Sequence, residues 1–131
     1  MREIKFRGRD SELFLWRYGD LDTKSSPDLV SIIDECDYSV DPDTVGQFTG
    51  LKDHKEREIY EGDIVKVVSD GEESFHVVKY MIEEDYPAFD LEPALDGDFN
   101  SLSYCFIDID TKITVIGNIY DNPELLKLTK K

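Results

Sequence analysis

Apolar and polar residues alternate over two stretches at the start of the chain. Residues 3–7 alternate with the two-residue period of a strand that buries one face. Turn-forming residues at 8–11 follow, and residues 13–18 then alternate again. The pattern predicts an N-terminal β-hairpin over residues 3–18.

A helical signal interrupts the strand pattern inside an acidic insertion, residues 19–43. Ser26 is suited to cap a helix, Pro27 to occupy its first turn, and Asp28 to interact favourably with the helix dipole. The apolar residues that follow have the i, i+3, i+4, i+7 spacing of one helical face: Leu29, Ile32, Ile33 and Cys36. The insertion is therefore predicted to contain one α-helix over residues 27–36.

From residue 45 onward the alternation returns and predicts a β core over residues 45–120. The expected strands cover residues 45–49, 64–68, 74–82, 102–109 and 112–120, with a further short strand at 89–91. Asp70-Gly71 is typical of a two-residue hairpin turn, and Asp110-Thr111 is expected to join the last two strands. A closing helical turn is expected over residues 122–128. Many short strands of this kind indicate a barrel or a sandwich.

The composition is that of a folded and strongly acidic protein. The chain has 131 residues, and its 30 acidic and 15 basic side chains give a formal net charge of −15. That length predicts a single domain, residues 1–131, with a substantial core. The charge disfavours binding to nucleic acid or to an anionic membrane, because like charges repel.

The acidic residues are concentrated in two segments. Residues 10–45 carry ten of them, and residues 83–98 carry seven. Because this excess belongs mainly to insertions and loops, a partner-specific role is expected there first. The candidate interaction surface predicted from the two segments has six members: Asp34, Glu35, Asp37, Glu83, Glu84 and Asp85.

The cysteines and the apolar runs predict a cytoplasmic protein. The first ten residues contain no apolar region of the signal-peptide kind, and no apolar run approaches the ~18 residues of a membrane helix. Cys36 and Cys105 lie far apart and outside any CxxC motif. Two reduced, buried thiols are expected, with a disulfide as the minor alternative.

One stretch has the opening spacing of a calcium-binding loop. Asp96, Asp98 and Asn100 follow the D-x-D-x-N pattern, but Ser101 and Ile107 occupy the positions that require Gly and a bidentate Glu. A solvated acidic loop is therefore expected.

The other titratable residues favour a structural role over a catalytic or metal site. Asp108 and Asp110 could place two carboxylates on one strand face, as in a metal or acid/base pair, but they also stand where a hairpin turn favours Asp, and the turn is expected. His54 and His76 have no partner at zinc-ligand spacing. No Gly-rich phosphate loop or nucleophile motif is present in the sequence. We predict no enzymatic activity and assign no catalytic residue, cofactor or metal ligand.

Three blocks of the sequence together resemble the YopX family of phage and prophage proteins. The first is Arg2-Glu-Ile-Lys-Phe-Arg7. The second is Val45-Gly-Gln-Phe-Thr-Gly-Leu-Lys-Asp53, continued by Glu58-Ile-Tyr-Glu-Gly-Asp-Ile-Val65, and the third is Ile116-Gly-Asn-Ile-Tyr-Asp-Asn-Pro-Glu-Leu-Leu126. The blocks span almost the whole chain in the expected order. Gly8-Arg9-Asp10 replaces the family's usual Ala-Trp-Asp, so Trp16 would have to replace that tryptophan.

The resemblance implies an SH3-like barrel and a cytoplasmic setting in a bacterial host, and it implies no established activity. We therefore predict a mainly β fold, a small SH3-like barrel with added strands, one inserted α-helix and a short C-terminal helical turn. The residues of the blocks for which a folding role is expected are Gly46, Gly50, Tyr60, Gly62, Asp63, Gly117 and Pro123.

The leading functional hypothesis is a non-enzymatic binding or adaptor protein of phage origin. It would act through contacts with an unidentified protein partner, and self-association is part of the same hypothesis. One alternative is an acidic mimic of DNA that occupies a host DNA-binding protein. The other is a nucleic-acid-binding barrel, which needs six basic residues to converge on one patch: Arg2, Lys5, Arg7, Lys52, Lys55 and Arg57.

Overall fold

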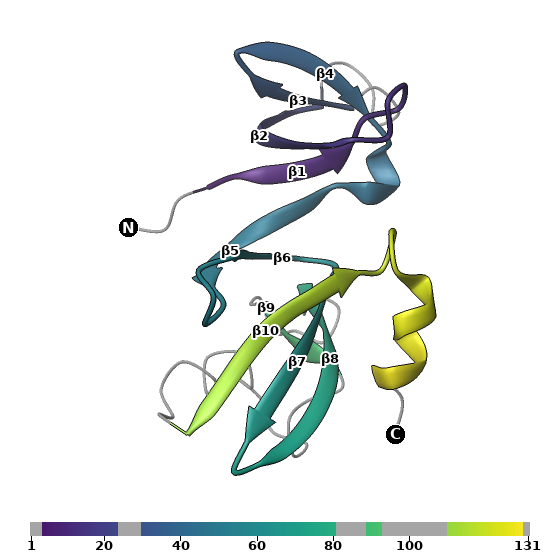
Figure 1. Ribbon diagram of the computed structural model, residues 1–131. Coiled ribbons are helices and arrows are strands. Elements are labelled where there is room, and N and C mark those ends of the chain that lie inside the picture. The colour runs from purple at the N-terminus through teal and green to yellow at the C-terminus, as the bar shows by residue number, and fades with distance from the viewer. Residues whose placement is uncertain (1–3, 24–29, 81–88, 93–109, 130–131) are drawn as a thin grey trace. The chain divides into compact units, whose positions relative to one another are not determined.

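The computed structural model describes residues 4–23, 30–80, 89–92 and 110–129 (Figure 1). The chain divides into two compact units, Met1–Gly50 and Leu51–Lys131. The elements of the first unit are β1 (Phe6–Arg9), β2 (Trp16–Asp22), β3 (Val30–Asp34), β4 (Cys36–Val40) and the 3₁₀ helix η1 (Pro42–Thr44). Strand β5 (Gly46–Lys52) leads into the second unit, which contains β6 (Glu58–Tyr60), β7 (Asp63–Ser69), β8 (Glu72–Tyr80), β9 (Phe89–Glu92), β10 (Thr111–Asn118) and the 3₁₀ helix η4 (Pro123–Thr129).

The first unit is built on an antiparallel sheet whose strands pair in the order β4-β3-β2-β1-β5, and β5 pairs on its other side with β6. The predicted N-terminal hairpin is confirmed as β1 and β2, in which Arg7 pairs with Tyr18 and Arg9 with Trp16. Its second strand begins later than the alternation predicts, because residues 10–15 form the connecting loop. One face carries a small core of Val30, Ile32 and Val40, against which Phe6, Leu21 and Val45 pack.

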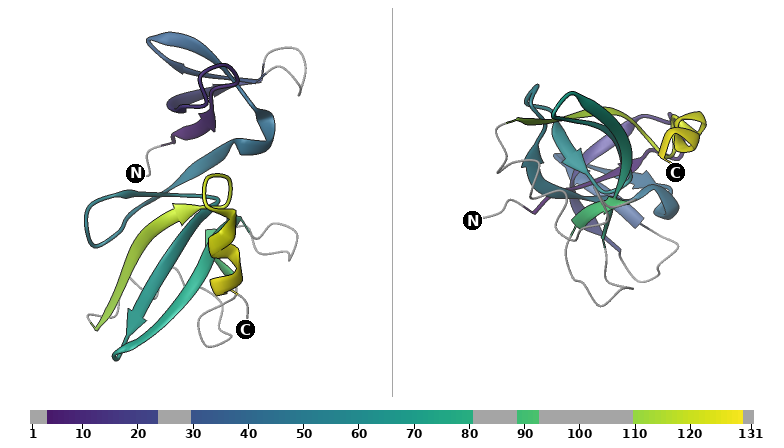
Figure 2. Two further views of the ribbon diagram at one scale, coloured as in Figure 1. Left: turned by 45° about the vertical axis from the view of Figure 1, so that its right-hand side comes forward. Right: turned by 90° about the horizontal axis from the view of Figure 1, so that it is seen from below.

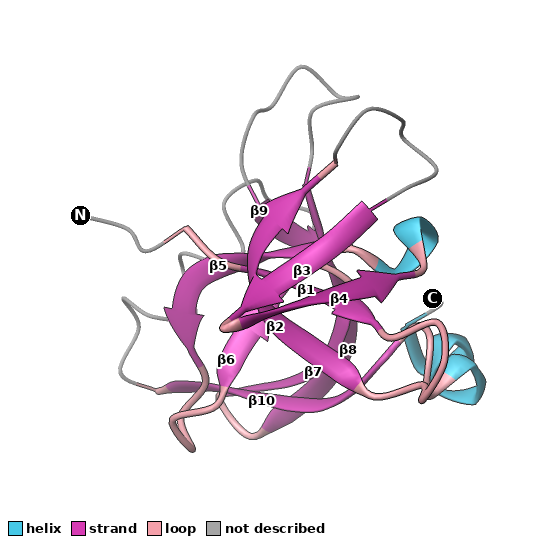
Figure 3. Ribbon diagram, turned by 90° about the horizontal axis from the view of Figure 1, so that it is seen from above, coloured by secondary structure: helices cyan, strands magenta, loops and turns pink. Residues whose placement is uncertain are grey.

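The α-helix predicted over residues 27–36 is wrong. Residues 27–29 lie outside the described residues, and the remainder forms the hairpin of β3 and β4, which Figure 3 shows as strands. Ile32 pairs with Tyr38, and the chain turns at Glu35, whose φ is 63°. Val30, Ser31 and Ile32 are buried, whereas Ile33 is 38% exposed, so burial follows a period of two only among the apolar residues of this strand. The β-branched residues of this segment favour a strand, and the hydrogen bonds with β2 stabilise the strand over the predicted helix.

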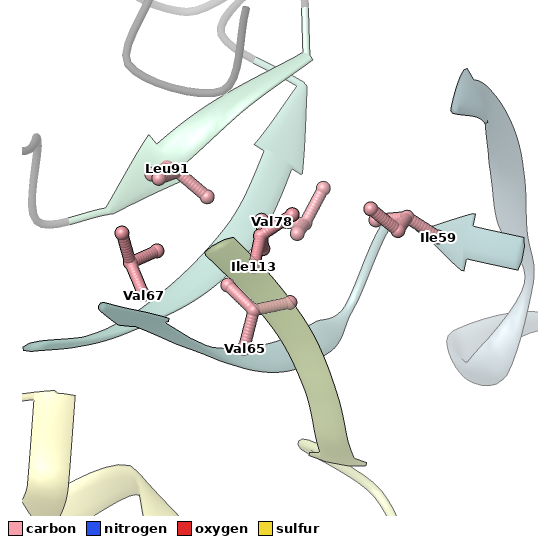
Figure 4. Packing of buried hydrophobic residues seen from close by; sticks show 6 residues of the cluster. All are labelled: Ile59, Val65, Val67, Val78, Leu91 and Ile113. Atoms are coloured by element: carbon pink, nitrogen blue, oxygen red, sulfur yellow. The ribbon is translucent and has the colours of Figure 1, made fainter. Parts of the chain in front are cut away.

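The second unit contains an antiparallel sheet with the order β10-β7-β8-β9. The predicted Asp70-Gly71 hairpin is confirmed, since Ser69 pairs with Glu72 across a two-residue loop. Both loop residues have positive φ, 52° and 83°, as this kind of turn requires. Figure 4 shows the apolar core of this unit, formed by Ile59, Val65, Val67, Val78, Leu91 and Ile113.

The end of the chain forms η4, where a closing helical turn was predicted. This 3₁₀ helix begins at Pro123 and lies beside β8 (Figure 2). The described strands make a mainly β fold of two antiparallel sheets, and no closed barrel is found among them. The predicted strand over residues 102–109 lies outside the described residues. No helix of the described part has the length and apolar character needed to cross a membrane.

Candidate functional site

Three consecutive apolar side chains are exposed in the loop between β1 and β2. Leu13 is 63% exposed, Phe14 71% and Leu15 52%. We call these three residues the apolar loop tip. Isolated exposed apolar residues are common on protein surfaces, whereas a contiguous group marks an interaction site more often. The loop tip is therefore the candidate functional site of the first unit.

Hydrogen bonds to Asp10 fix the shape of this loop. Its carboxylate Oδ1 accepts from the backbone N–H groups of Glu12 at 2.8 Å and Leu13 at 3.1 Å. Its own backbone donates to the carbonyl of Leu15 at 2.8 Å and accepts from the N–H of Phe14 at 3.0 Å. The loop tip is thus held in one conformation before any partner binds, which reduces the entropy lost on binding.

The side chain of Arg17 makes a second set of contacts with Asp10 and holds its carboxylate in place. The Nε and Nη2 atoms of Arg17 each lie 3.1 Å from Asp10 Oδ2, and the guanidinium stacks on the Tyr38 ring with Cζ 3.9 Å from its centroid. The backbone hydrogen bonds from Glu12 and Leu13, and then Arg17, lower the pKa of Asp10 below its usual 3.8. The carboxylate therefore stays ionised at neutral pH, as its role of acceptor requires.

Phe14 has a backbone conformation that aromatic residues avoid. Its φ is 59°, in the left-handed region that glycine and asparagine favour. For an ordinary L-residue this region costs about 1–2 kcal/mol. Unfavourable conformations of this kind are enriched at functional sites, where the fold holds them in place. An exposed aromatic ring in such a position contributes little to folding, and this favours a role in binding.

The basic residues of the first unit pack on aromatic rings. The guanidinium carbons of Arg7 and Arg9 lie 4.8 and 5.3 Å from the centroid of the Trp16 ring, and Lys5 Nζ lies 5.4 Å from that of Phe48. Arg7 is 5% exposed. The six basic residues that the nucleic-acid hypothesis needs are divided between the units, and Arg2 lies outside the described residues. That hypothesis stays a prediction.

The predicted acidic surface is only partly described. Asp34, Glu35 and Asp37 are exposed around the turn between β3 and β4. The other three members, Glu83, Glu84 and Asp85, lie outside the described residues. Whether the six carboxylates form one surface, as the interaction and DNA-mimic hypotheses expect, stays a prediction.

Two of the family-like blocks meet around a tight turn between β6 and β7. Asp63 is 1% exposed, and its Oδ2 accepts from the N–H of Tyr60 at 2.7 Å. Gly62 has a φ of 93°, and its N–H donates to the carbonyl of Val78 at 2.8 Å. Ile119, from the third block, donates to the carbonyl of Gly62 at 3.0 Å. The Glu-Gly-Asp sequence therefore fixes the turn between β6 and β7 and links it to β8 and to the third block.

Asp53 connects the loop after β5 to β10. It is 3% exposed, and Oδ1 accepts from the N–H groups of Lys55 and Arg57, both at 2.9 Å. Oδ2 accepts from the N–H of Val115 at 2.9 Å and from Arg57 Nε at 3.2 Å. Burial acts to raise the pKa of Asp53, but these hydrogen bonds and the charge of Arg57 outweigh it and lower the pKa below 3.8.

Acid is expected to destabilise the protein through Asp10 and Asp53. Both have a folded-state pKa below the ordinary value of 3.8, so their contribution to stability is complete above that value. It is lost as the pH falls through 3.8 toward the lower folded-state values. Urea unfolding between pH 7 and pH 2 should show a fall below about pH 4. An Asp53→Asn variant should show a smaller fall over the same window, and an unchanged fall would contradict the assignment.

The third block forms a turn around two asparagines. Asn118 Oδ1 accepts from the N–H groups of Tyr120 and Asp121 at 2.9 and 2.8 Å. Asn122 Oδ1 accepts from the N–H of Asn118 at 3.2 Å. A Cβ at Gly117 would lie 2.5 Å from this same Oδ1, so any larger residue there would have to displace the Asn122 side chain. Gly117 also lies at a register shift between β10 and β7.

Gly117→Ala is expected to lower the free energy of unfolding by about 1–3 kcal/mol, because the added methyl must displace the Asn122 side chain. Urea unfolding measures the change. Lys112→Ala, at an exposed position of the same strand, is the control and should alter stability by less than about 0.5 kcal/mol. Equal stability of the two variants would show that the turn rearranges freely.

The other candidates for chemistry lie apart or outside the described residues. Asp96–Asn100, Asp108 and Cys105 belong to the segments that the structure does not describe. His54 is exposed, and His76 is 2% exposed with Nε2 2.7 Å from Ser74 Oγ. Among the described residues, no group of three or more His, Cys, Asp or Glu side chains could hold a metal ion. Cys36 is a free, exposed thiol at the start of β4, directly after the turn between β3 and β4, so the prediction of a buried thiol is wrong at this position.

The sequence pattern misses the apolar loop tip. Alternation assigns residues 13–18 to a strand, which would have buried one of every two apolar side chains. One signal for an exposed loop is present in the sequence: four apolar residues follow one another from Leu13 to Trp16, whereas a strand with one buried face alternates apolar and polar residues. A second signal is Asp10, a turn-forming residue whose carboxylate accepts a hydrogen bond from the backbone two residues later, at Glu12.

Comparison with known proteins places the chain in a family. The family model described as YopX protein matches residues 5–127, and the chain therefore belongs to the YopX family. It is also similar to the solved structure titled "Crystal structure of protein EF1440 from Enterococcus faecalis", with 26% sequence identity and a TM-score of 0.62. That similarity covers 96% of this chain and 99% of the other. No curated protein matches the sequence.

Proposed function

We propose that this member of the YopX family is a non-enzymatic binding or adaptor protein of phage or prophage origin that acts in the bacterial cytoplasm through protein–protein contacts. The observation that carries the proposal is the apolar loop tip, Leu13, Phe14 and Leu15, exposed on a loop that Asp10 holds rigid.

The loop tip has the properties of a binding hot spot. Aromatic and large apolar side chains contribute most of the binding energy at protein interfaces, and they do so most strongly when they enter a complementary pocket. The Asp10 hydrogen bonds and the Arg17 contact hold the tip in place, so a partner would not have to order it. Truncating one such anchor typically costs 2 kcal/mol of binding energy or more, roughly 30-fold in affinity.

Phe14→Asn tests the proposal, because asparagine tolerates the left-handed backbone while removing the ring. Wild-type and variant chains are used as paired baits in a lysate of the bacterial strain that carries the gene, with quantitative mass spectrometry as the readout. We expect at least one protein to be retained by the wild type and reduced 10-fold or more with Phe14→Asn, in line with the loss of a hot spot.

Two measurements make this comparison decisive. Ile4→Asn is the matched control, because Ile4 is 68% exposed in the same unit but lies outside the loop tip, and it should retain the partner. Phe14→Asn should also raise the free energy of unfolding by about 0.5–1 kcal/mol, since it relieves the strained φ and loses almost no burial. A partner profile that is identical for all three baits would overturn the proposal.

A further inference from the structure

Strand β10 lies at one side of the second unit's sheet, as far as the structure describes that sheet. Its inner edge pairs with β7. In an antiparallel strand, alternate residues direct their backbone N–H and C=O groups to opposite edges. The outer edge of a strand is therefore a template to which another chain can add, and natural proteins usually cover or blunt it.

The loop between β5 and β6 covers the middle of this outer edge. The N–H of His54 donates to the carbonyl of Ile113 at 3.1 Å, and Asp53 Oδ2 accepts from the N–H of Val115 at 2.9 Å. Figure 1 shows this loop next to β10. The second carboxylate oxygen of Asp53 accepts from the N–H groups of Lys55 and Arg57, so the same side chain holds the loop together and holds it against β10. We call residues 53–57 the edge strap.

The two backbone groups that the edge strap engages are complementary to each other. If two β10 strands pair in antiparallel fashion about a two-fold axis at Thr114, Ile113 of one copy lies opposite Val115 of the second copy. The carbonyl of Ile113 then accepts from the N–H of Val115 of the second copy, and the reverse bond forms by symmetry. The edge strap thus occupies the hydrogen-bonding positions that a second β10 strand would take.

We infer that the outer edge of β10 is an interaction surface for the β10 strand of a second copy of this chain, and that the edge strap keeps this surface covered. The inference goes beyond the proposed function, because it concerns the second unit and makes no use of the loop tip. A register shift between Val115 and Gly117 shortens the regular part of β10, and the net charge of −15 on each copy opposes pairing. A short strap is therefore sufficient cover.

His54→Pro opens the strap with little damage to the loop. The N–H of Glu56 donates to the carbonyl of Asp53 at 3.0 Å, which makes His54 the second residue of a β-turn, a position that proline favours. The His54 side chain is exposed, so the main loss is the N–H that bonds Ile113. His54→Ala keeps this N–H and is the matched control.

Self-association of the variants is measured by sedimentation velocity at protein concentrations up to about 1 mM. High salt is used because it screens the repulsion between the two acidic copies. We expect the association constant of His54→Pro to exceed that of His54→Ala roughly 5- to 10-fold, which corresponds to one hydrogen bond of the cover. Equal constants for the two variants would overturn the inference, as would monomers throughout.

Thr114→Glu, added to His54→Pro, tests where the two copies meet. It places like charges opposite each other at the two-fold axis, whereas within one copy the new carboxylate lies opposite Lys66 of β7. Lys112→Gln is the control, because it lies exposed on the same strand and changes the net charge by the same amount. Thr114→Glu should return the association constant to that of His54→Ala, and Lys112→Gln should not. Association that survives Thr114→Glu would overturn the inference.

Two further comparisons separate strand pairing from other causes of association. Asp53→Ala opens the strap by a second route, and Gly19→Ala in the first unit is its control, since a similar loss of stability is expected there. Equal association of these two variants would contradict the role of the strap. Phe14→Asn, added to His54→Pro, should leave association unchanged. A loss of association with Phe14→Asn would assign the contact to the loop tip and overturn this inference alone, without affecting the proposed function.

Discussion

An Asp53→Ala variant is expected to unfold with a free energy about 3–5 kcal/mol lower than that of the wild-type chain. The substitution leaves three backbone N–H groups, those of Lys55, Arg57 and Val115, without their shared acceptor at a buried site. The ion pair with Arg57 adds less, because half of that side chain is exposed to solvent. The loss therefore comes mainly from unsatisfied backbone donors, and urea unfolding at pH 7 measures it.

Two companion variants test this explanation. Lys55→Ala keeps the backbone donor at the same turn and removes only an exposed side chain, so its stability should stay within about 0.5 kcal/mol of wild type. Asp53→Asn keeps the volume and one acceptor oxygen for the N–H groups of Lys55 and Arg57, but it turns an NH₂ group toward the N–H of Val115, so it should lose about 1–3 kcal/mol, less than alanine. An Asp53→Asn variant with wild-type stability would show that the hydrogen-bond network is not what stabilises this loop.

The sequence predicts those parts of the fold that local chemistry determines. The turn at Asp70 and Gly71 requires two residues with positive φ, and this dipeptide is among the few that tolerate them. Pro123 is the first residue of η4. A proline fits this position because it has no N–H to donate and its fixed φ suits the first turn of a helix. In both cases a short stretch of sequence contains all the information needed, and pairing with a distant strand changes nothing.

The hairpin of β3 and β4 shows where local information is insufficient. Apolar residues at 29, 32, 33 and 36 fit a helix, while Val30, Ile32 and Val40 fit a strand with one buried face. Both periods are present, so the segment could be assigned only by its tertiary partner. That partner is β2, whose Leu21 pairs with Ile32. Register with another strand cannot be derived from the segment itself.

The candidate site was missed for a related reason. Exposure of Leu13, Phe14 and Leu15 depends on where β2 begins, and the Asp10 carboxylate sets that point by capping the loop. Charge patterning did direct attention to residues 10–45, the segment that contains the loop tip. The composition therefore identified the segment in which the site lies, whereas its exposed apolar residues required the structure.

The strand that follows the loop tip contains the other position with a large expected effect. Gly19→Ala should lower the free energy of unfolding by about 3 kcal/mol, since a Cβ at this position would lie directly against the carbonyl oxygen of Ile33 and 3.0 Å from its carbon. Those atoms belong to the backbone of β3, which pairs with β2 at the next residue, so the clash cannot be relieved by a side-chain rotation. Thermal or urea unfolding of the variant measures the loss.

Gly71→Ala separates this steric effect from the general difficulty of replacing a glycine. Gly71 has a φ of 83°, but nothing lies within 4 Å of a Cβ built there, so alanine should cost only the backbone strain of about 1 kcal/mol. Because β2 also carries Arg17, separation of β2 from β3 should weaken the stack of Arg17 on Tyr38 that supports Asp10. Gly19→Ala should therefore lower binding at the loop tip as well as stability, whereas Gly71→Ala should leave binding unchanged. Equal losses in the two variants would contradict the close backbone approach at Gly19.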